Sequence, residues 1–168
     1  MPKSNVIHVS DNSYEWFTPV NIIEAARGVM GRIDCDPASC LEANAVIGAE
    51  MFYTKDEDGL TFSWFGNVWL NPPYNMPLIE MFSARVVSEY QKGNIISAIV
   101  LVNNSTDTKW FHLLLEASSA ICLIRRRMKF WNGDKILAAR QGQAIFYLGT
   151  NLNKFAGVFS DFGAVMSC

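Results

Sequence analysis

Residues 66–74 read Gly66-Asn67-Val68-Trp69-Leu70-Asn71-Pro72-Pro73-Tyr74, an apolar segment that runs into two prolines. The apolar segment is typical of a buried strand, whereas consecutive prolines prevent both helix formation and strand pairing. We therefore predict a strand that ends in a rigid loop over residues 71–74, which we call the NPPY loop. In open α/β sheets, the loops that follow strands are where ligands bind.

Predicted helices and strands alternate upstream of the NPPY loop. Thr18 is the predicted N-cap, and Pro19 the first residue, of an amphipathic helix that stops at Gly31. A short strand over residues 32–37 follows and ends at a proline turn. Residues 41–49 are predicted to be helical or irregular.

The same alternation continues downstream. Residues 78–92 and 108–117 are predicted helices, and between them residues 95–102 form a continuous apolar run of the kind buried in a parallel sheet. Two β-rich runs, residues 120–130 and 143–148, predict an antiparallel pair. This order predicts an α/β fold with an open, mostly parallel sheet and helices on both faces.

The composition predicts a folded single domain over residues 1–168. Half of the 168 residues are hydrophobic and 18% are charged, which argues against disorder. The net charge of -2 means that any site for a polyanion must be local. The N-terminus has no apolar signal region and no run is long enough to span a membrane, so we expect a cytoplasmic protein. Four cysteines without CxxC spacing and two distant histidines argue against a metal site.

The NPPY loop has the groups needed to activate a planar nitrogen. The amine of a nucleobase is a poor nucleophile because its lone pair is delocalised into the ring. The Asn71 side-chain oxygen and the Pro72 carbonyl could each accept one N–H of such an amine, while the prolines keep the loop stiff. Tyr74 would offer a ring face for a base to stack on. The simpler alternative is a rigid turn with a packed tyrosine.

A set of motifs, taken in order along almost the whole chain, resembles the phage DNA N6-adenine methyltransferase family. The motifs are Glu15-Trp16-Phe17-Thr18-Pro19, Asp34-Cys35-Asp36-Pro37-Ala38-Ser39, Asp58-Gly59-Leu60 with Trp64, Val68-Trp69-Leu70-Asn71-Pro72-Pro73-Tyr74, Ile99-Val100-Leu101-Val102-Asn103-Asn104, Thr106-Asp107-Thr108 with Trp110-Phe111, and Arg127-Met128-Lys129-Phe130-Trp131. The resemblance implies a Rossmann-like class I methyltransferase sheet, abbreviated in its second and third strands, and S-adenosylmethionine as the methyl donor.

The resemblance also implies roles for individual residues. The implied catalytic residues are Asn71, Pro72, Pro73 and Tyr74; those beside the methionine end of the cofactor are Thr18, Pro19, Asp36, Pro37, Ala38 and Ser39; and Asp58 lies near its adenine ring. An N-cap or turn aspartate is the simpler interpretation of Asp36. The usual glycine-rich loop is missing, and Glu50 is only a weak candidate for the ribose because a solvated surface glutamate fits equally well.

Arg125-Arg126-Arg127 with Lys129 is the dense basic run of the chain, next to Phe130 and Trp131. In a strand, Arg125 and Arg127 would point to the same side. A charged, solvated strand edge is one interpretation. The other is contact with DNA phosphates, with Phe130 packing on the flipped base and residues 132–142 as a minimal DNA-recognition loop. The predicted DNA-binding residues are Arg125, Arg127, Lys129, Phe130, Lys135 and Arg140.

The predicted reaction is methyl transfer from S-adenosylmethionine to N6 of an adenine flipped out of double-stranded DNA. The resemblance implies modification of phage or prophage DNA against host restriction, in the bacterial cytoplasm. Cytosine N4, RNA adenine or protein glutamine are alternative acceptors, and a catalytically silent nucleic-acid-binding module is an alternative from another class. His112 is expected to be a packed helix residue, and residues 155–168 a strand that packs on the core or faces a partner in a homodimer.

Overall fold

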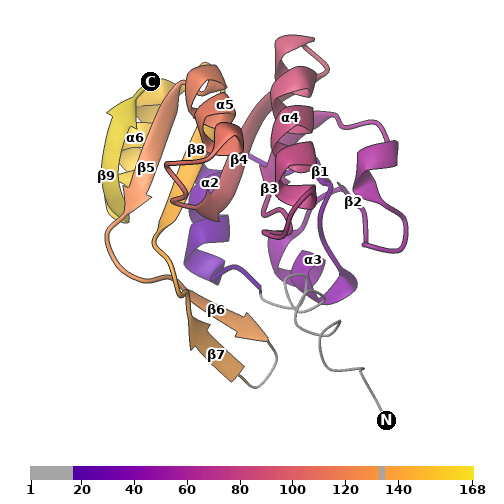
Figure 1. Ribbon diagram of the computed structural model, residues 1–168, viewed down its shortest axis with the longest axis horizontal. Coiled ribbons are helices and arrows are strands. Elements are labelled where there is room, and N and C mark those ends of the chain that lie inside the picture. The colour runs from indigo at the N-terminus through magenta and orange to yellow at the C-terminus, as the bar shows by residue number, and fades with distance from the viewer. Residues whose placement is uncertain (1–16, 133–134) are drawn as a thin grey trace.

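The computed structural model describes residues 17–132 and 135–168 (Figure 1). One of the two histidines (His8), residues 133–134 of the predicted recognition loop and the Glu15-Trp16 part of the first motif therefore lie outside the described residues. The central sheet has seven strands in the order β2-β1-β3-β4-β8-β5-β9. Their bounds are β1 Cys35–Asp36, β2 Met51–Phe52, β3 Gly66–Leu70, β4 Ile95–Asn103, β5 Ala120–Ile124, β8 Gln143–Leu148 and β9 Gly163–Ser167.

Five of the seven strands run in the same direction. Strands β2, β1, β3 and β4 pair in parallel. Strand β8 is antiparallel to both β4 and β5, so β5 shares the direction of β4, and β9 is antiparallel to β5. The result is a mixed α/β fold with a mostly parallel central sheet, as predicted. Between β1 and β3 the described chain forms one further strand, the two-residue β2.

Helices cover both faces of the sheet, which explains why its central strands are apolar throughout. In β3, Trp69 packs with α2 (Val20–Met30), α3 (Leu41–Ile47) and α6 (Leu152–Phe159). Its neighbours Val68 and Leu70 pack on the other face with α4 (Leu78–Gln91) and α5 (Lys109–Ala117). Successive side chains of a strand point to opposite faces, so two covered faces require an unbroken apolar run.

The structure corrects three predicted segments, two of them around the second sheet and the third at the C-terminus. The run 120–130 is interrupted, because β5 ends at Ile124 and β6 (Lys129–Asn132) belongs to a second sheet. The predicted loop over residues 132–142 contains β7 (Lys135–Ala138), which pairs with β6 in a hairpin that projects from the body of the molecule (Figure 1).

The C-terminal segment is a helix followed by an edge strand rather than one strand. Phe155 and Phe159 are four residues apart, so both fall on one face of α6 and are fully buried. Only β9 fulfils the strand prediction. No helix in the described part of the chain is long and apolar enough to cross a membrane.

Candidate active site

The NPPY loop leaves the sheet at the carboxyl end of β3, as the sequence predicts. Pro72 and Pro73 are buried, while Asn71 and Tyr74 are half-buried. Within residues 17–132 and 135–168, no hydrogen bond to the Pro72 carbonyl is found. That oxygen is therefore free to accept a hydrogen bond from a ligand.

The amide of Asn71 is held at both ends. Its Nδ2 donates to the Thr18 hydroxyl at 3.3 Å, and its Oδ1 accepts from the Tyr74 hydroxyl at 2.9 Å. These two partners assign the amide atoms, because the Thr18 oxygen accepts from the nitrogen and the Tyr74 hydroxyl donates to the oxygen. An amide oxygen has two lone pairs, so Oδ1 retains capacity for a second donor.

Thr18 is not the N-cap that its sequence position predicts. Helix α2 begins after Pro19, without a side-chain capping bond. The Thr18 side chain is 5% exposed and lies against Asn71 instead. Its hydroxyl therefore accepts a hydrogen bond from the NPPY loop.

The hydroxyl of Tyr74 points into the protein. Besides Asn71, it lies 3.3 Å from the Leu101 carbonyl and 3.2 Å from Gln143 Oε1. Burial raises the pKa of the Tyr74 phenol well above its usual range, so the group remains a neutral donor. The half-buried ring also packs against the core layer under α4 and α5.

The turn of residues 36–39 follows β1, the neighbour of β3 in the sheet. Asp36 is 1% exposed, and its Oδ1 accepts from the Ala38 N–H at 3.2 Å. Burial raises the pKa of Asp36 to about 7, partly offset by the hydrogen bonds from Ala38 and Ser39. No ion pair of Asp36 occurs in the described part of the chain, so this carboxyl group suits a cationic ligand.

A hollow of about 360 Å³ lies between the turn after β1, the turn before the 3-10 helix η2 (Gly59–Thr61) and the start of α4. Its lining includes Pro37, Asp58, Leu60 and Asn75, the residue that follows the NPPY loop. The structure thus brings two of the predicted cofactor segments together beside the predicted catalytic loop. Asp58 is exposed, and its carboxylate accepts from the Leu60 N–H at 3.2 Å.

Gly59 holds this hollow in shape. A Cβ at this position would overlap the carbonyl oxygen of Pro37, so the two turns touch backbone to backbone. Trp64 Nε1 donates to the Gly59 carbonyl at 2.8 Å, and Arg85 Nη1 donates to the Leu60 carbonyl at 2.9 Å. These bonds clamp the turn from the opposite side.

One predicted cofactor contact, Pro19, and the weak ribose candidate, Glu50, lie elsewhere. Pro19 lines a separate hollow of about 600 Å³ together with the arginine run, rather than the hollow beside Asp58. Glu50 directly precedes β2, which runs parallel to β1. It therefore sits at the amino edge of the sheet, away from the carboxyl ends where the NPPY loop and the Asp36 turn lie.

The arginine run follows β5 but is not part of it. Arg125, Arg126 and Arg127 are all exposed in a bend, so the predicted alternation of a strand does not apply. Together with Lys129 and Asp161 they line the 600 Å³ hollow. Lys135 and Arg140 are also exposed, in β7 and just after it.

Phe130 occupies a different environment from the one predicted. It is 8% exposed and packs in the core layer under α2, so its ring face is covered and is not available to a flipped base. Its neighbour Trp131 packs edge-on against Phe17, and its Nε1 donates to the Thr18 carbonyl at 3.3 Å. Strand β6 is thereby attached to the segment that contacts Asn71.

Residues 5–152 match the model of the family described as DNA N-6-adenine-methyltransferase (Dam). The chain belongs to the Dam family. It is 35% identical over 98 residues to the DNA N-6-adenine-methyltransferase of Escherichia phage T1, covering 57% of this chain and 38% of that protein. It is 30% identical over 137 residues to the protein of the same name from Haemophilus phage HP1, covering 80% of this chain and 75% of the relative.

This Dam-family chain has two site residues that sequence reasoning missed. Gln143 is 2% exposed and touches Tyr74, and it is the polar first residue of the apolar strand β8, which is a visible signal. Arg85 supports the Asp58 turn from α4. From the sequence, Glu89 one helical turn away predicts only a local ion pair with Arg85, and nothing indicates the contact of Arg85 with the Asp58 turn.

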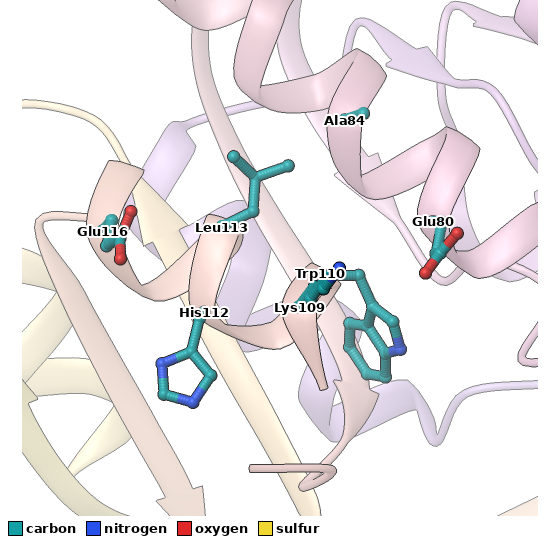
Figure 2. A pocket seen from close by; sticks show the side chains of 7 residues that line it. All are labelled: Glu80, Ala84, Lys109, Trp110, His112, Leu113 and Glu116. Atoms are coloured by element: carbon teal, nitrogen blue, oxygen red, sulfur yellow. The ribbon is translucent and has the colours of Figure 1, made fainter. Parts of the chain in front are cut away.

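A third hollow in the Dam-family chain, of about 460 Å³, lies between α4 and α5 and includes His112 (Figure 2). His112 is exposed on α5 rather than packed as expected from the sequence, with Nε2 2.8 Å from the Thr106 carbonyl. It contacts neither the NPPY loop nor the Asp36 turn. Among the residues that the structure describes, no group of three His, Cys, Asp or Glu side chains could hold a metal ion.

Proposed function

We propose that this Dam-family chain transfers a methyl group from S-adenosylmethionine to N6 of an adenine flipped out of double-stranded DNA. The observation that carries the proposal is the clamped amide of Asn71. Thr18 and Tyr74 fix its orientation, and its oxygen retains a free lone pair beside the Pro72 carbonyl, which accepts no hydrogen bond from the residues that the structure describes. Two fixed acceptors are what an exocyclic amine with two N–H groups requires.

The chain's own residues act on the amine. Asn71 Oδ1 and the Pro72 carbonyl each accept a hydrogen bond from one N–H of the amine. This draws the nitrogen toward tetrahedral geometry, so that its lone pair is less delocalised into the ring and can attack. S-adenosylmethionine, when bound, would supply an electrophilic methyl group on a sulfonium, whose S–C bond would break as the N–C bond forms, leaving S-adenosylhomocysteine. The methylated nitrogen then loses one proton to solvent. The buried prolines hold both acceptors in place.

We assign the cofactor to the hollow beside Asp58. The buried Asp36 carboxyl complements the positive α-amino group, with Pro37, Ala38 and Ser39 forming the turn around it. The Asp58 carboxylate is the acceptor for the adenine amine. The mixed α/β sheet is compatible with a Rossmann-like methyltransferase fold, in which ligands bind at the carboxyl ends of strands.

We expect cofactor affinity to increase with pH between about 5.5 and about 7.5, because Asp36 must ionise to pair with an ammonium group. Burial raises the pKa of Asp36 to about 7 in the free protein, so the carboxyl is protonated below that pH. A raised carboxyl pKa also means that the unbound fold loses stability as pH rises from the unfolded pKa toward 7.

Calorimetric titration with S-adenosylhomocysteine, in two buffers of different ionisation enthalpy, measures both the affinity and the proton released. Asp36→Asn is the control: its affinity should be lower and should not change over this pH range. A wild-type affinity that is flat with pH, with no proton released, would contradict the assignment of Asp36.

We propose that the arginine run and the β6–β7 hairpin contact DNA, with residues 132–142 as the minimal recognition element. The exposed side chains of Arg125, Arg127, Lys129, Lys135 and Arg140 support this proposal. Because β6 is attached to Thr18 through Trp131, the basic surface adjoins the segment that holds Asn71.

Arg125→Gln/Arg127→Gln should raise the KM for DNA and lower the slope of log affinity against log salt by about 2, since each lost phosphate contact removes about one released counterion. Cofactor affinity should not change. Lys92→Gln/Lys154→Gln is the matched control, because it also removes two exposed positive charges, one just after α4 and one in α6. Equal salt slopes for both double variants would count against a DNA contact at the arginine run.

The overall reaction is tested with labelled S-adenosylmethionine and unmethylated duplex DNA, followed by mass spectrometry of the nucleosides. We expect N6-methyladenine. N4-methylcytosine would retain the mechanism and change the base, and methylation of RNA or protein alone would change the substrate class. A chain that binds neither S-adenosylmethionine nor its product would fit a silent nucleic-acid-binding module. The biological role that we propose is modification of phage or prophage DNA against host restriction.

A further inference from the structure

The Tyr74 hydroxyl has more acceptors than it can serve. Asn71 Oδ1, the Leu101 carbonyl and Gln143 Oε1 all lie within 3.3 Å of its oxygen, yet a phenol donates only one proton. Leu101 lies on β4, and its carbonyl is the backbone acceptor among the three. Gln143 Oε1 is the side-chain acceptor that competes with Asn71.

The hydrogen bonds of the Gln143 side chain favour the orientation that presents its oxygen to Tyr74. Its Nε2 lies 2.7 Å from Asn103 Oδ1 and 3.4 Å from the Gln141 carbonyl, both of which are acceptors. If the Gln143 amide turned around while Asn103 stayed in place, its oxygen would face two other oxygens, Asn103 Oδ1 and the Gln141 carbonyl. Gln143 is also 2% exposed, so water does not compete for its Oε1.

We propose that Gln143 is a positioning residue: when the target amine binds, the Tyr74 hydroxyl stops donating its hydrogen bond to Asn71 and donates it to Gln143 instead. The inference rests on the proposed function. While Tyr74 donates to Asn71, one lone pair of Oδ1 is occupied and its acceptor strength is reduced. Rotation of the O–H bond toward Gln143 Oε1, 3.2 Å away, gives the amine an unshared acceptor without breaking any covalent bond. Gln143 thus acts on Asn71 through Tyr74, across the start of β8 and the end of β3.

The test is a double-mutant cycle on the single-turnover rate of methyl transfer, using Gln143→Met and Tyr74→Phe. Gln143→Met is similar in size but offers no acceptor, so the rate should fall about tenfold while cofactor affinity stays within about twofold. In the Tyr74→Phe background there is no hydroxyl proton to redirect, so the same substitution should change the rate by less than about twofold. An equal loss in both backgrounds overturns the proposal.

Gln143→Glu is the second variant, because one carboxyl oxygen of the glutamate still accepts from Tyr74. Asn103 can turn its amide so that its nitrogen donates to the second carboxyl oxygen. Its rate should exceed that of Gln143→Met at least threefold, roughly the size of one hydrogen bond. If Gln143→Met fails to fold, a Gln143→Glu rate below about a tenth of wild type, with normal cofactor binding, overturns the proposal.

A readout that needs no methyl transfer separates this inference from the proposed function. The ¹³Cζ resonance of Tyr74, assigned by its loss in Tyr74→Phe, reports hydrogen bonding of the phenol. In the complex with duplex DNA and S-adenosylhomocysteine it should move in Gln143→Met, and a resonance that this substitution leaves unchanged in that complex overturns the proposal. Absence of N6-methyladenine with the wild-type chain contradicts the proposed function, and the resonance still decides whether Gln143 shares the proton.

Discussion

Asn71→Ala should lower the rate of methyl transfer to adenine by about a hundred- to a thousandfold, the usual loss when one preorganised partner of a transition state is removed. The side-chain oxygen is one of the two acceptors that we assign to the amine, and alanine has no group to replace it. Binding of S-adenosylhomocysteine should stay within about twofold, because the proposed cofactor hollow is formed by the Asp36 and Asp58 turns.

The rate is measured under single-turnover conditions, with thermal melting and cofactor binding followed in parallel. Asn153→Ala is the matched control, since this asparagine is exposed on α6. Asn71→Asp retains an acceptor oxygen but loses the Nδ2 donor to Thr18, so its rate should lie between those of wild type and Asn71→Ala. An Asn71→Ala chain that binds cofactor and methylates within threefold of wild type would remove the central acceptor from the mechanism.

Gly59→Ala should reduce cofactor affinity at least tenfold and lower the free energy of unfolding by about 1–3 kcal/mol, as expected for an overpacked site. The added methyl group would overlap the Pro37 carbonyl oxygen, and backbone cannot rotate away as a side chain can. Trp64 and Arg85 hold the Asp58 turn from the other side, so the displacement has to open the contact between the two turns. Both turns form the hollow that we assign to the cofactor.

Gly157→Ala makes the same chemical change at a site with no neighbour within 4 Å of the new Cβ, in the helix α6. It should leave affinity unchanged and raise stability slightly, because alanine favours helix over glycine. Calorimetric titration and chemical unfolding of the two variants give the comparison. Wild-type affinity in a folded Gly59→Ala chain would show that the contact between the turns does not shape the cofactor site.

Much of the fold follows from local patterns. The apolar spacing of residues 20–30 and the Gly31 stop predict α2, and the unbroken apolar run at 95–102 predicts β4 with helices on both faces. The break between β5 and β6 was not predictable in this way, because the runs on both sides are β-rich and the sheet to which each belongs is a long-range property. Residues 155–159 show that a short apolar segment fits both strand and helix until its packing partners are known.

The sequence by itself determined that a rigid loop with an amide, a proline carbonyl and a tyrosine follows a buried strand, since prolines and apolar runs act on their immediate neighbours. Only the tertiary structure decided what those groups contact. Thr18 meets Asn71 across 53 positions and Tyr74 meets Gln143 across 69, while Phe130 turns into the core and Arg125 to Arg127 face outward. Such contacts depend on how the helices and strands pack around the sheet, and the local sequence carries little of that information.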